Sequence, residues 1–354
     1  MAKRVSDSVV VITGASSGIG RAAALEFARR GATVVLAARG EEGLQSAAKE
    51  CEDLGARTLA VPTDTTDEAA VKNLARQAID SFGRIDVWVN DAAVTLFGRF
   101  EESPMDVYRR VIETNLFGYI HGARAAIAHF RERGSGVLIN VASVVSGAPQ
   151  PYTSAYVTSK YAVRALGVSL RMELSLDQAD DIHVCTVMPA TIDTPLFQHA
   201  ANYTGRGVKP LPPVYPADPV ASTIVELVEN PHREVVVGRA GRSFLWLNRL
   251  APSLYEYIAA RQVDRSHLTQ GSTQFTPGNV FTPMPQYASV SGGWMEEEKS
   301  SLGTWIMTGL AVAAPMLLYW AGRRLMPAAR TPPSMSERVS NVARKIPELL
   351  GVGS

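Results

Sequence analysis

The sequence has few of the residues that build disulfide frameworks and metal sites. Its 354 residues include two cysteines and six histidines. The cysteines, Cys51 and Cys185, fall on separate predicted elements, and no two histidines lie three or four residues apart. A metal usually needs clustered ligands, and a disulfide framework needs more cysteines. The sequence therefore predicts no metal site and no disulfide-stabilised fold.

The chain also lacks a strong net charge and a secretory signal. Its formal net charge is +1 at pH 7, so no basic field favours a nucleic acid as the partner. The N-terminal residues MAKRVSDS lead directly into an apolar run and contain no apolar signal core. The composition, 46% hydrophobic and 19% charged, instead predicts a large packed core. We therefore expect a folded domain in the reducing cytosol, without a nucleic-acid partner.

Short β-branched runs alternate with longer amphipathic stretches over residues 9–238. Predicted strands cover 9–13, 33–37, 58–61, 85–90, 137–143, 183–188 and 234–237. Predicted helices cover 19–30, 41–54, 67–82, 104–132, 153–176 and 219–229. Most of the strands are continuous hydrophobic runs, which is typical of parallel strands covered by helices on both faces. The pattern predicts an α/β fold with a doubly wound, mostly parallel Rossmann-type sheet, whose ligands bind at the carboxyl ends of the strands.

A glycine-rich turn follows the first predicted strand and opens the first helix. It has the sequence TGASSGIG, which places glycines at Gly14, Gly18 and Gly20 and the intervening residues Ser16, Ser17 and Ile19. Glycine permits backbone conformations that bring amides close to a phosphate, and a helix N-terminus favours an anion. The turn therefore predicts a dinucleotide phosphate site. Its spacing, G-x3-G-x-G, differs from the usual fingerprint, and a purely structural turn is the alternative.

Two positions after the next strands indicate which dinucleotide binds. An acidic residue at the end of the second strand would hold the ribose 2′-hydroxyl of NAD, but Arg39 follows Ala38 there. An arginine can bind a 2′-phosphate, so the sequence favours NADP over NAD, with a solvated arginine as the alternative. Asp64, after the third strand, is placed to accept a hydrogen bond from the adenine amino group. It could equally cap the next helix, for which Asp67 is the better candidate.

A tyrosine, a lysine and a serine form the predicted catalytic group. Tyr156 and Lys160 are four residues apart and share one face of a predicted helix, and Ser143 ends a predicted strand. A neighbouring cation favours the phenolate, so we expect Lys160 to lower the pKa of Tyr156 and to let it exchange a proton near neutral pH. The pair alone is weak evidence, because a tyrosine that merely packs in the core is the common alternative.

The ordered set of motifs resembles the short-chain dehydrogenase/reductase family. TGASSGIG, NDAA after the fourth strand, Asn115, Ser143, the Tyr156–Lys160 pair and PATIDTP after the sixth strand occur in the family's order, over about residues 6–238. The resemblance implies a single Rossmann-type domain and a catalytic tetrad of Asn115, Ser143, Tyr156 and Lys160. Tyr156 would protonate the developing alkoxide, Ser143 would hold the carbonyl oxygen, and Lys160 would bind the nicotinamide ribose. Asn115 would hold a water molecule, with a helix–sheet hydrogen bond as the structural alternative.

The resemblance also implies a set of cofactor contacts. Besides the glycine turn, Arg39, Asp64 and the Tyr156–Lys160 pair, the set comprises Thr65, Asn90, Ala92, Pro189, Ile192 and Thr194. Two motifs depart from the family's pattern, because Ala93 replaces the glycine of NNAG and Ala190 replaces the glycine of PG. An added methyl group narrows backbone freedom without removing a catalytic atom. The departures therefore bear on cofactor geometry more than on activity.

Two further stretches are expected near the substrate. Residues 194–216 are rich in proline, glycine and aromatics, and they predict a substrate lid. Leu196, Phe197 and Tyr203 favour a nonpolar substrate, unless they simply pack the loop. Residues 241–262 form an amphipathic stretch broken by a proline. It covers the pocket mouth, contacts a membrane surface or packs as an ordinary core helix.

The C-terminal part departs in composition from the predicted domain, which covers residues 1–262. Residues 263–300 collect Ser, Thr, Gln, Gly and Pro and predict a flexible linker. Residues 301–324 contain an uncharged run from Leu302 to Gly322 that is long enough to span a bilayer. Residues 325–354 predict a basic amphipathic tail. A buried or oligomerisation helix is the alternative for the run, and a coiled coil is the alternative for the tail.

Together these features predict a membrane-associated oxidoreductase whose catalytic domain faces the cytoplasm. It would interconvert a carbonyl and a secondary alcohol on a lipophilic small molecule with NADP(H), NAD being less favoured. The basic residues after the span favour the opposite orientation, but an NADPH enzyme without an export signal needs the cytosolic pool. The resemblance implies homodimers or homotetramers through the long helices at 104–132 and 153–176. The alternative function is a catalytically silent NADP-binding sensor or scaffold at the membrane.

Overall fold

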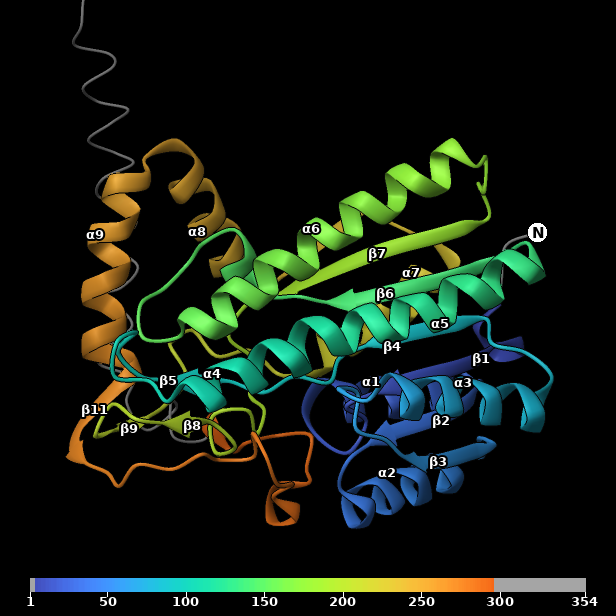
Figure 1. The fold of residues 1–354 in the computed structure, drawn as a ribbon, viewed down its shortest axis with the longest axis horizontal. Coiled ribbons are helices and arrows are strands. Elements are labelled where there is room, and N and C mark those ends of the chain that lie inside the picture. Colours follow the sequence, from blue (N-terminus) through green and yellow to red (C-terminus); the bar gives the residue numbers. More distant parts are fainter. Residues whose placement is uncertain (1–3, 296–354) are drawn as a thin grey trace, which may run out of the picture. The chain divides into compact units, whose positions relative to one another are not determined.

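The structure, a computed structural model, describes residues 4–295 (Figure 1). Its centre is one parallel sheet of seven strands in the order β10-β7-β6-β4-β1-β2-β3. The strands are β1 (Val9–Thr13), β2 (Thr33–Ala38), β3 (Thr58–Pro62), β4 (Val87–Asn90), β6 (Gly136–Val141), β7 (Ile182–Pro189) and β10 (Glu234–Val237). The strand order reverses at β1, so the carboxyl ends of β1 and β4 flank a crevice where such sheets bind ligands. The predicted doubly wound parallel sheet is confirmed.

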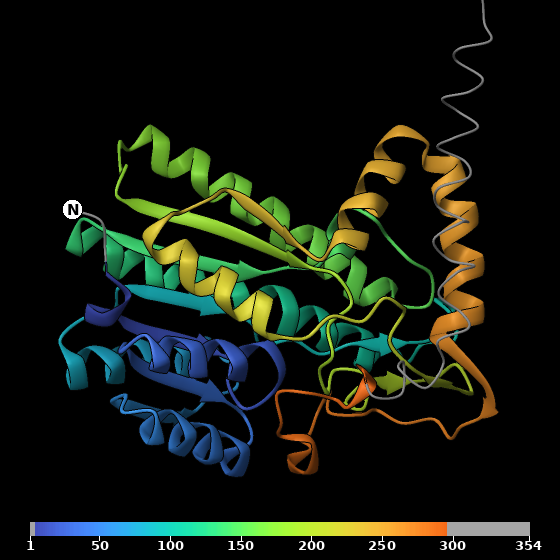
Figure 2. The same ribbon diagram turned by 180° about the vertical axis from the view of Figure 1, so that it is seen from behind.

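Helices cover both faces of this sheet (Figures 1 and 2). One face carries α1 (Gly18–Arg29), α2 (Glu41–Asp53) and α7 (Asp218–Glu229). The other face carries α3 (Glu68–Phe82), α5 (Gly118–Arg133) and α6 (Ser154–Leu176). Along β1, Val10 and Ile12 join the first core, whereas Val9 and Val11 join the second. Both sides of each strand are therefore apolar, which explains the continuous hydrophobic runs in the sequence.

The predicted helix at 104–132 is interrupted in the structure. It consists of α4 (Met105–Ile112), a π-helical turn (Glu113–Phe117) and α5. Such turns insert one residue into a helix and are frequent at functional sites. This one contains Asn115, whose side chain is fully buried. The interruption therefore places a predicted catalytic residue inside the domain rather than on a regular helix face.

Smaller elements follow the main sheet at its carboxyl edge. They are β5 (Leu96–Phe97), β8 (Ala201–Asn202), β9 (Arg206–Val208), α8 (Arg239–Leu250), α9 (Pro252–Gln262), a π-helical turn (Val263–His267), β11 (Leu268–Ser272) and short 3-10 helices at Val144–Ser146 and Pro285–Tyr287. A further 3-10 helix, Val5–Asp7, precedes β1. β5 pairs with β8, and β11 pairs antiparallel with β9. The stretch predicted as a lid thus contains two short strands, each paired with a distant segment.

Residues 263–295 differ from the flexible linker that the composition predicted. Thr276 and Asn202 exchange backbone hydrogen bonds of 2.8 and 3.0 Å, and the Ser289 carbonyl accepts from the Gly18 amide at 2.8 Å. Val280 is fully buried. Because backbone groups make most of these contacts, a Ser-, Gly- and Pro-rich composition does not reveal them.

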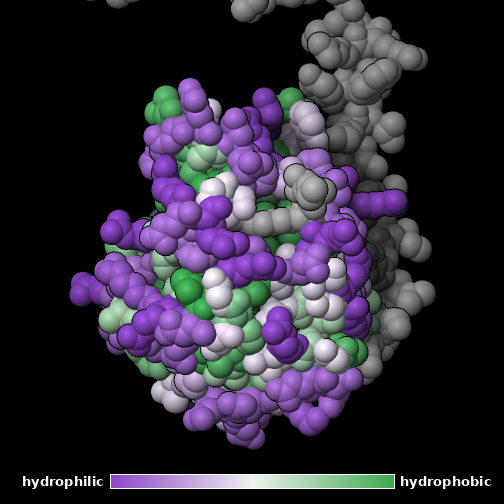
Figure 3. Space-filling view, turned by 90° about the vertical axis from the view of Figure 1, so that its right-hand side faces the viewer, coloured by the Kyte–Doolittle hydropathy of each residue, from purple (hydrophilic) through white to green (hydrophobic). Residues whose placement is uncertain are grey.

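No helix within residues 4–295 combines the length and apolarity needed to cross a bilayer. The predicted span at 301–324 and the predicted tail at 325–354 lie outside the described residues. On the side of the molecule where the strands begin, hydrophilic residues dominate the surface, with hydrophobic residues between them (Figure 3). The predicted site lies at the opposite ends of the strands.

Candidate active site

A cavity of about 290 Å³ lies at the carboxyl ends of the central strands. The glycine turn, the residues after β2, β3, β4, β6 and β7, and the start of α6 line it. It brings together most of the predicted residues, namely Gly14, Ser16, Ser17, Gly18, Ile19, Arg39, Asp64, Thr65, Ala92, Ser143, Tyr156, Lys160, Pro189, Ile192 and Thr194. Gly20, Asn90 and Asn115 are the predicted residues that do not line it.

Ser143 and Tyr156 meet in this cavity. Ser143 follows β6 and caps the short helix after it, where its hydroxyl accepts a hydrogen bond of 3.3 Å from the Val145 amide. Tyr156 lies in the first turn of α6, and its phenol hydrogen-bonds with the Ser143 hydroxyl. The end of a strand and the start of a helix therefore hold two hydroxyls together, where one substrate oxygen can contact both.

Lys160 is buried next to this pair, with 1% of its surface exposed. Its Nζ donates to the Val141 carbonyl at 2.8 Å and to the Tyr119 hydroxyl at 3.0 Å. It lies 5.6 Å from the centre of the Tyr156 ring. Tyr119 was not predicted from the sequence. It follows Asn115 by four residues, and that helical spacing is the signal that could have found it.

The pKa values at the site differ from the predicted pattern. Burial raises the pKa of Tyr156 well above its ordinary value, and the hydrogen bond with Ser143 offsets this in part. Burial also lowers the pKa of Lys160, opposed by the negative charge of Asp91. The expected net lowering of the Tyr156 pKa is therefore wrong in this structure, because burial dominates and the Lys160 ammonium donates its hydrogen bonds to the Val141 and Tyr119 oxygens. The result is a neutral phenol, which is the form that donates a proton.

Asn115 holds the loop after β4 in place. Its Oδ1 accepts from the Val94 amide at 2.8 Å, and its Nδ2 donates to the Val94 carbonyl at 2.9 Å and to the Ser159 hydroxyl at 3.1 Å. The side chain thus bonds to the loop after β4 and to α6, rather than to a strand of the sheet, so the helix–sheet hydrogen bond given as its structural alternative is not the one formed. Val94 itself lines the cavity, so Asn115 shapes the site from behind.

The glycine turn and the start of α1 line the cavity and include an unpaired backbone amide. Gly14 adopts φ 76°, and an added Cβ would lie 2.8 Å from the Ala92 Cα. The Gly18 amide donates to the Ser289 carbonyl at 2.8 Å, and the Gly20 amide donates to the Asp91 carboxylate. The amide of Ile19, between them, has no acceptor within residues 4–295. An unpaired amide at a helix N-terminus fits a phosphate oxygen.

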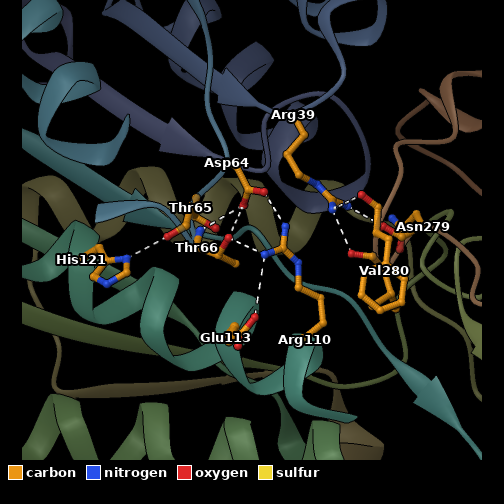
Figure 4. A network of polar contacts seen from close by, with 10 residues as sticks. Arg39, Asp64, Thr65, Thr66, Arg110, Glu113, His121, Asn279 and Val280 are labelled. Carbon is orange, nitrogen blue, oxygen red and sulfur yellow. Dashed lines mark hydrogen bonds and ion pairs between the residues drawn. The ribbon is translucent and has the colours of Figure 1, made fainter. Parts of the chain in front are cut away.

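Asp64 belongs to a network of charged and polar groups (Figure 4). Its carboxylate accepts from the Thr66 amide at 3.0 Å and the Thr66 hydroxyl at 2.8 Å, and it pairs with Arg110. Burial raises the pKa of Asp64, but these hydrogen bonds and the charge of Arg110 lower it overall. The α3 cap is Asp67, which accepts from the Ala69 amide at 2.8 Å. Asp64 is therefore an ionised residue at the cavity edge, with much of its acceptor capacity already used.

Arg39 points into the same region from the end of β2 (Figure 4). Its guanidinium donates to the carbonyls of Asn279, Val280 and Phe281. Burial lowers its pKa, opposed by the charge of Asp64. No carboxylate within residues 4–295 lies within ion-pair distance of Arg39. The nearby carboxylate of Asp64 pairs with Arg110. The sequence could not reveal the three carbonyl partners, which lie about 240 residues away along the chain.

Asn90 and Gly20 serve the packing around the cavity. The Asn90 amide donates to the Tyr119 carbonyl at 3.1 Å and to Asn140 Oδ1 at 2.9 Å, and its Oδ1 accepts from Trp88 at 2.8 Å. These bonds tie β4 to β6 and α5, and the side chain is fully buried. At Gly20 an added Cβ would lie 2.4 Å from the carbonyl oxygen of the glycine turn. In the structure, neither residue lines the cavity.

The second half of the cavity is mainly apolar. It starts at the loop after β7, where Thr194 is nearly buried. The predicted lid and the elements α8 and α9 close it with Phe197, Leu211, Pro212, Pro213, Phe244, Tyr255, Ala259 and Val263. Of the three roles considered for residues 241–262, the structure shows that this stretch lines the pocket.

Comparisons with known proteins agree with this geometry. The short chain dehydrogenase family model matches residues 8–203. The uncharacterized oxidoreductase YxnA of Bacillus subtilis is 38% identical over 258 residues, covering 72% of this chain and 72% of the relative. Dehydrogenase/reductase SDR family member 7B of Danio rerio is 32% identical over 270 residues, covering 72% of this chain and 85% of the relative. Among solved structures, the Thermococcus sibiricus alcohol dehydrogenase complexed with 5-hydroxy-NADP is 27% identical with a TM-score of 0.57, covering 65% of this chain and 95% of that chain.

The chain therefore belongs to the short-chain dehydrogenase/reductase family. It is an oxidoreductase that acts on CH–OH groups with a nicotinamide dinucleotide, as the family match and the dehydrogenase neighbours show.

Proposed function

We propose that the protein is an NADP(H)-dependent oxidoreductase that interconverts a carbonyl and a secondary alcohol on a lipophilic small molecule. The convergence of Tyr156 and Ser143 beside the glycine turn, in one cavity, carries the proposal. A proton donor and a hydrogen-bond donor for the substrate oxygen lie next to a place for a dinucleotide. This is the arrangement that a carbonyl reduction requires.

The side chains have separate roles in the proposed reaction. When bound, the nicotinamide supplies the hydride. Ser143 donates a hydrogen bond to the carbonyl oxygen, and Tyr156 donates its proton to the same oxygen as negative charge develops there. Lys160 stabilises the negative charge left on the phenol and binds the nicotinamide ribose. The Ile19 amide holds the pyrophosphate, and Thr194 holds the nicotinamide carboxamide. The reverse steps oxidise the alcohol.

Arg39 supports the preference for NADP(H) over NAD(H). Its guanidinium carries a positive charge with no carboxylate partner in the described chain, and it follows β2, the position from which doubly wound sheets contact the ribose 2′-substituent. The Thermococcus relative was solved with an NADP derivative. We expect Arg39→Met to weaken NADPH binding by at least about tenfold and NADH binding by less than about twofold. Equal losses for the two cofactors, measured by isothermal titration, would argue against the preference.

The apolar lining of the second half of the cavity supports a lipophilic substrate. Phe197, Leu211 and Phe244 lie there with few charged neighbours. Each additional methylene that becomes buried should raise kcat/KM by about fourfold along a series of methyl ketones, until the cavity is filled. If kcat/KM stays constant or falls along the series, the substrate is not lipophilic, but the proposed type of reaction is unaffected.

A ketone panel with NADPH also separates the enzyme from the alternative, a silent NADP-binding sensor or scaffold. The proposal requires turnover that depends on Tyr156, which Tyr156→Phe measures directly. If the wild-type protein binds NADPH but oxidises it with no class of carbonyl compound, the sensor assignment is correct.

The C-terminal part supports a membrane location for the enzyme. The uncharged run from Leu302 to Gly322 is long enough to span a bilayer, and the catalytic domain would then face the cytoplasmic NADPH pool. The full chain should stay with membranes after a carbonate wash, whereas a chain ending at residue 295 should be released. Release of both proteins would contradict the anchor.

Exposed apolar side chains on α4 and α6 support self-association through the long helices. Met105 and Met172 are 63% and 64% exposed, and Leu176 is 84% exposed. We propose a homodimer or homotetramer formed through these helices. Sedimentation of the detergent-solubilised wild type and of Met172→Glu tests this, because the charged variant should shift to the monomer.

A further inference from the structure

Residues 277–294, which we call the strap, cross the part of the cavity that adjoins the glycine turn and Arg39. The strap residues that line the cavity are Asn279, Pro283, Met284, Pro285 and Ala288. The strap lies beyond the region that the family model matches, residues 8–203. It is therefore a part of the cavity lining that the family model does not cover.

The strap fixes the orientation of Arg39 through three main-chain carbonyls. Nη1 donates to the Val280 and Phe281 carbonyls at 2.9 and 3.3 Å, and Nη2 donates to the Asn279 carbonyl at 2.5 Å. A guanidinium has five N–H donors in a rigid fork. The Nε hydrogen and one Nη2 hydrogen remain, and they share the edge that makes bidentate contacts with phosphates. The strap therefore uses one edge of Arg39 and leaves the other for a ligand.

The charge balance around Arg39 suits a phosphate. The strap supplies neutral carbonyls, and the nearby carboxylate of Asp64 pairs with Arg110 (Figure 4). The positive charge of Arg39 is thus held in place without being neutralised. A half-buried, oriented cation of this kind favours a dianionic 2′-phosphate over a neutral 2′-hydroxyl.

Hydrogen bonds fasten the strap along its length. The Ala288 carbonyl accepts from Arg21 at 2.7 Å, and the Ser289 carbonyl accepts from the Gly18 amide at 2.8 Å. Further on, the Asp193 carboxylate accepts from the Ser291 hydroxyl at 2.7 Å and from the Trp294 amide at 2.9 Å. These hydrogen bonds lie near the glycine turn and at the loop after β7, which are the two walls of the proposed cofactor site.

We propose that the strap is a specificity element of the dinucleotide site, because it positions Arg39 for the 2′-phosphate and so favours NADP(H) over NAD(H). The inference rests on the proposed function, since it concerns the cofactor of the same site. It adds that the preference depends on residues 277–294 as well as on Arg39.

Gly278→Ala displaces the strap immediately before the three carbonyls. Gly278 adopts φ 53°, and an added Cβ would lie 2.1 Å from the His199 carbonyl oxygen, so the backbone has to move. Gly83→Ala is the matched control, because Gly83 also has a positive φ, of 77°, but nothing lies within 4 Å of an added Cβ. Asp193→Ala, which releases the other end of the strap, is a second variant should Gly278→Ala fail to fold.

Titration calorimetry on the full chain measures the affinity of each variant for NADPH and for NADH. Gly278→Ala and Asp193→Ala should weaken NADPH binding by about tenfold and NADH binding by less than about twofold, while Gly83→Ala binds both as the wild type does. In an Arg39→Met background, Gly278→Ala should change NADPH binding by less than about twofold, because the strap acts through that arginine.

The inference would be overturned by unchanged NADPH binding in both strap variants, by equal losses for NADPH and NADH, or by tighter NADPH binding, which would mean that the strap hinders the cofactor. A strap effect that persists at full size in the Arg39→Met background would also overturn it. Failure of the wild-type protein to bind either nucleotide would instead refute the proposed function itself, so the two failures are distinguishable.

Discussion

Replacing Tyr119 with phenylalanine removes one of the two oxygens that accept hydrogen bonds from the Lys160 ammonium. The distance is 3.0 Å, and the Val141 carbonyl at 2.8 Å is the remaining acceptor. Both side chains are 1% exposed, so water cannot easily replace the lost hydroxyl. A buried hydrogen bond to a charged group is worth about 1.5–3 kcal/mol. We therefore expect Tyr119→Phe to lower the free energy of unfolding by about 2 kcal/mol.

Urea denaturation at neutral pH measures this change, with an m-value equal to that of the wild type. Tyr161→Phe is the control, because it also removes a tyrosine hydroxyl, one residue after Lys160, but from a side chain that is 39% exposed. Its effect should stay below about 0.5 kcal/mol. A Tyr119→Phe protein as stable as the control would refute the reasoning, because Lys160 would then not depend on the hydroxyl.

The pH dependence of stability is a second test of the hydrogen bond between Lys160 and Tyr119. Burial already lowers the pKa of Lys160, so the folded protein binds fewer protons than the unfolded chain at alkaline pH, and folding becomes more favourable as pH rises there. Losing the Tyr119 oxygen should lower that pKa further. The stability deficit of Tyr119→Phe should therefore shrink as pH rises through the pKa of Lys160. The alkaline fall of kcat/KM should also move to lower pH.

Other predictions concern residues around the site. Burial lowers the pKa of His267 to about 4, so the unfolded chain binds more protons between this value and the ordinary value of 6.5. This group should then make stability fall by at most about 3 kcal/mol as pH drops through that window, and His267→Gln should remove this part of the slope in acid denaturation. His199, whose pKa burial also lowers to about 4, should keep its own part. At Gly122 an added Cβ would lie 2.2 Å from Asn90 Oδ1, so Gly122→Ala should cost about 3 kcal/mol in urea denaturation. Gly271→Ala, with nothing within 4 Å of the added Cβ, should be nearly neutral by comparison, and equal losses would contradict this packing account.

The parts of the fold that depend on local pattern could be predicted from the sequence. Apolar runs such as Val9–Thr13 identify buried parallel strands, because both faces of each strand are covered. Asp67 could be predicted as a helix cap from its place before an amphipathic run. The glycine turn, Ser143 and Tyr156 could be placed because their spacing follows the order of strands and helices.

Features that depend on distant segments could not be predicted. The partners of Arg39 are backbone carbonyls in the strap, and carbonyls leave no trace in composition. The direction of the pKa shift at Tyr156 depends on how deeply the phenol is buried and on where the Lys160 ammonium points. The Asn90 side-chain amide donates its hydrogen bonds to Tyr119 and Asn140 inside the domain. The NDAA motif alone does not distinguish these bonds from a cofactor contact.

The central claim is that Tyr156 donates the proton to the substrate oxygen. Single-turnover reduction of a ketone by enzyme-bound NADPH tests it most directly, with the wild type and Tyr156→Phe compared at saturating cofactor. The account predicts that the rate constant for hydride transfer falls by about a thousandfold in the variant, while NADPH affinity measured separately changes by less than about threefold. A variant that transfers hydride as fast as the wild type would contradict the account.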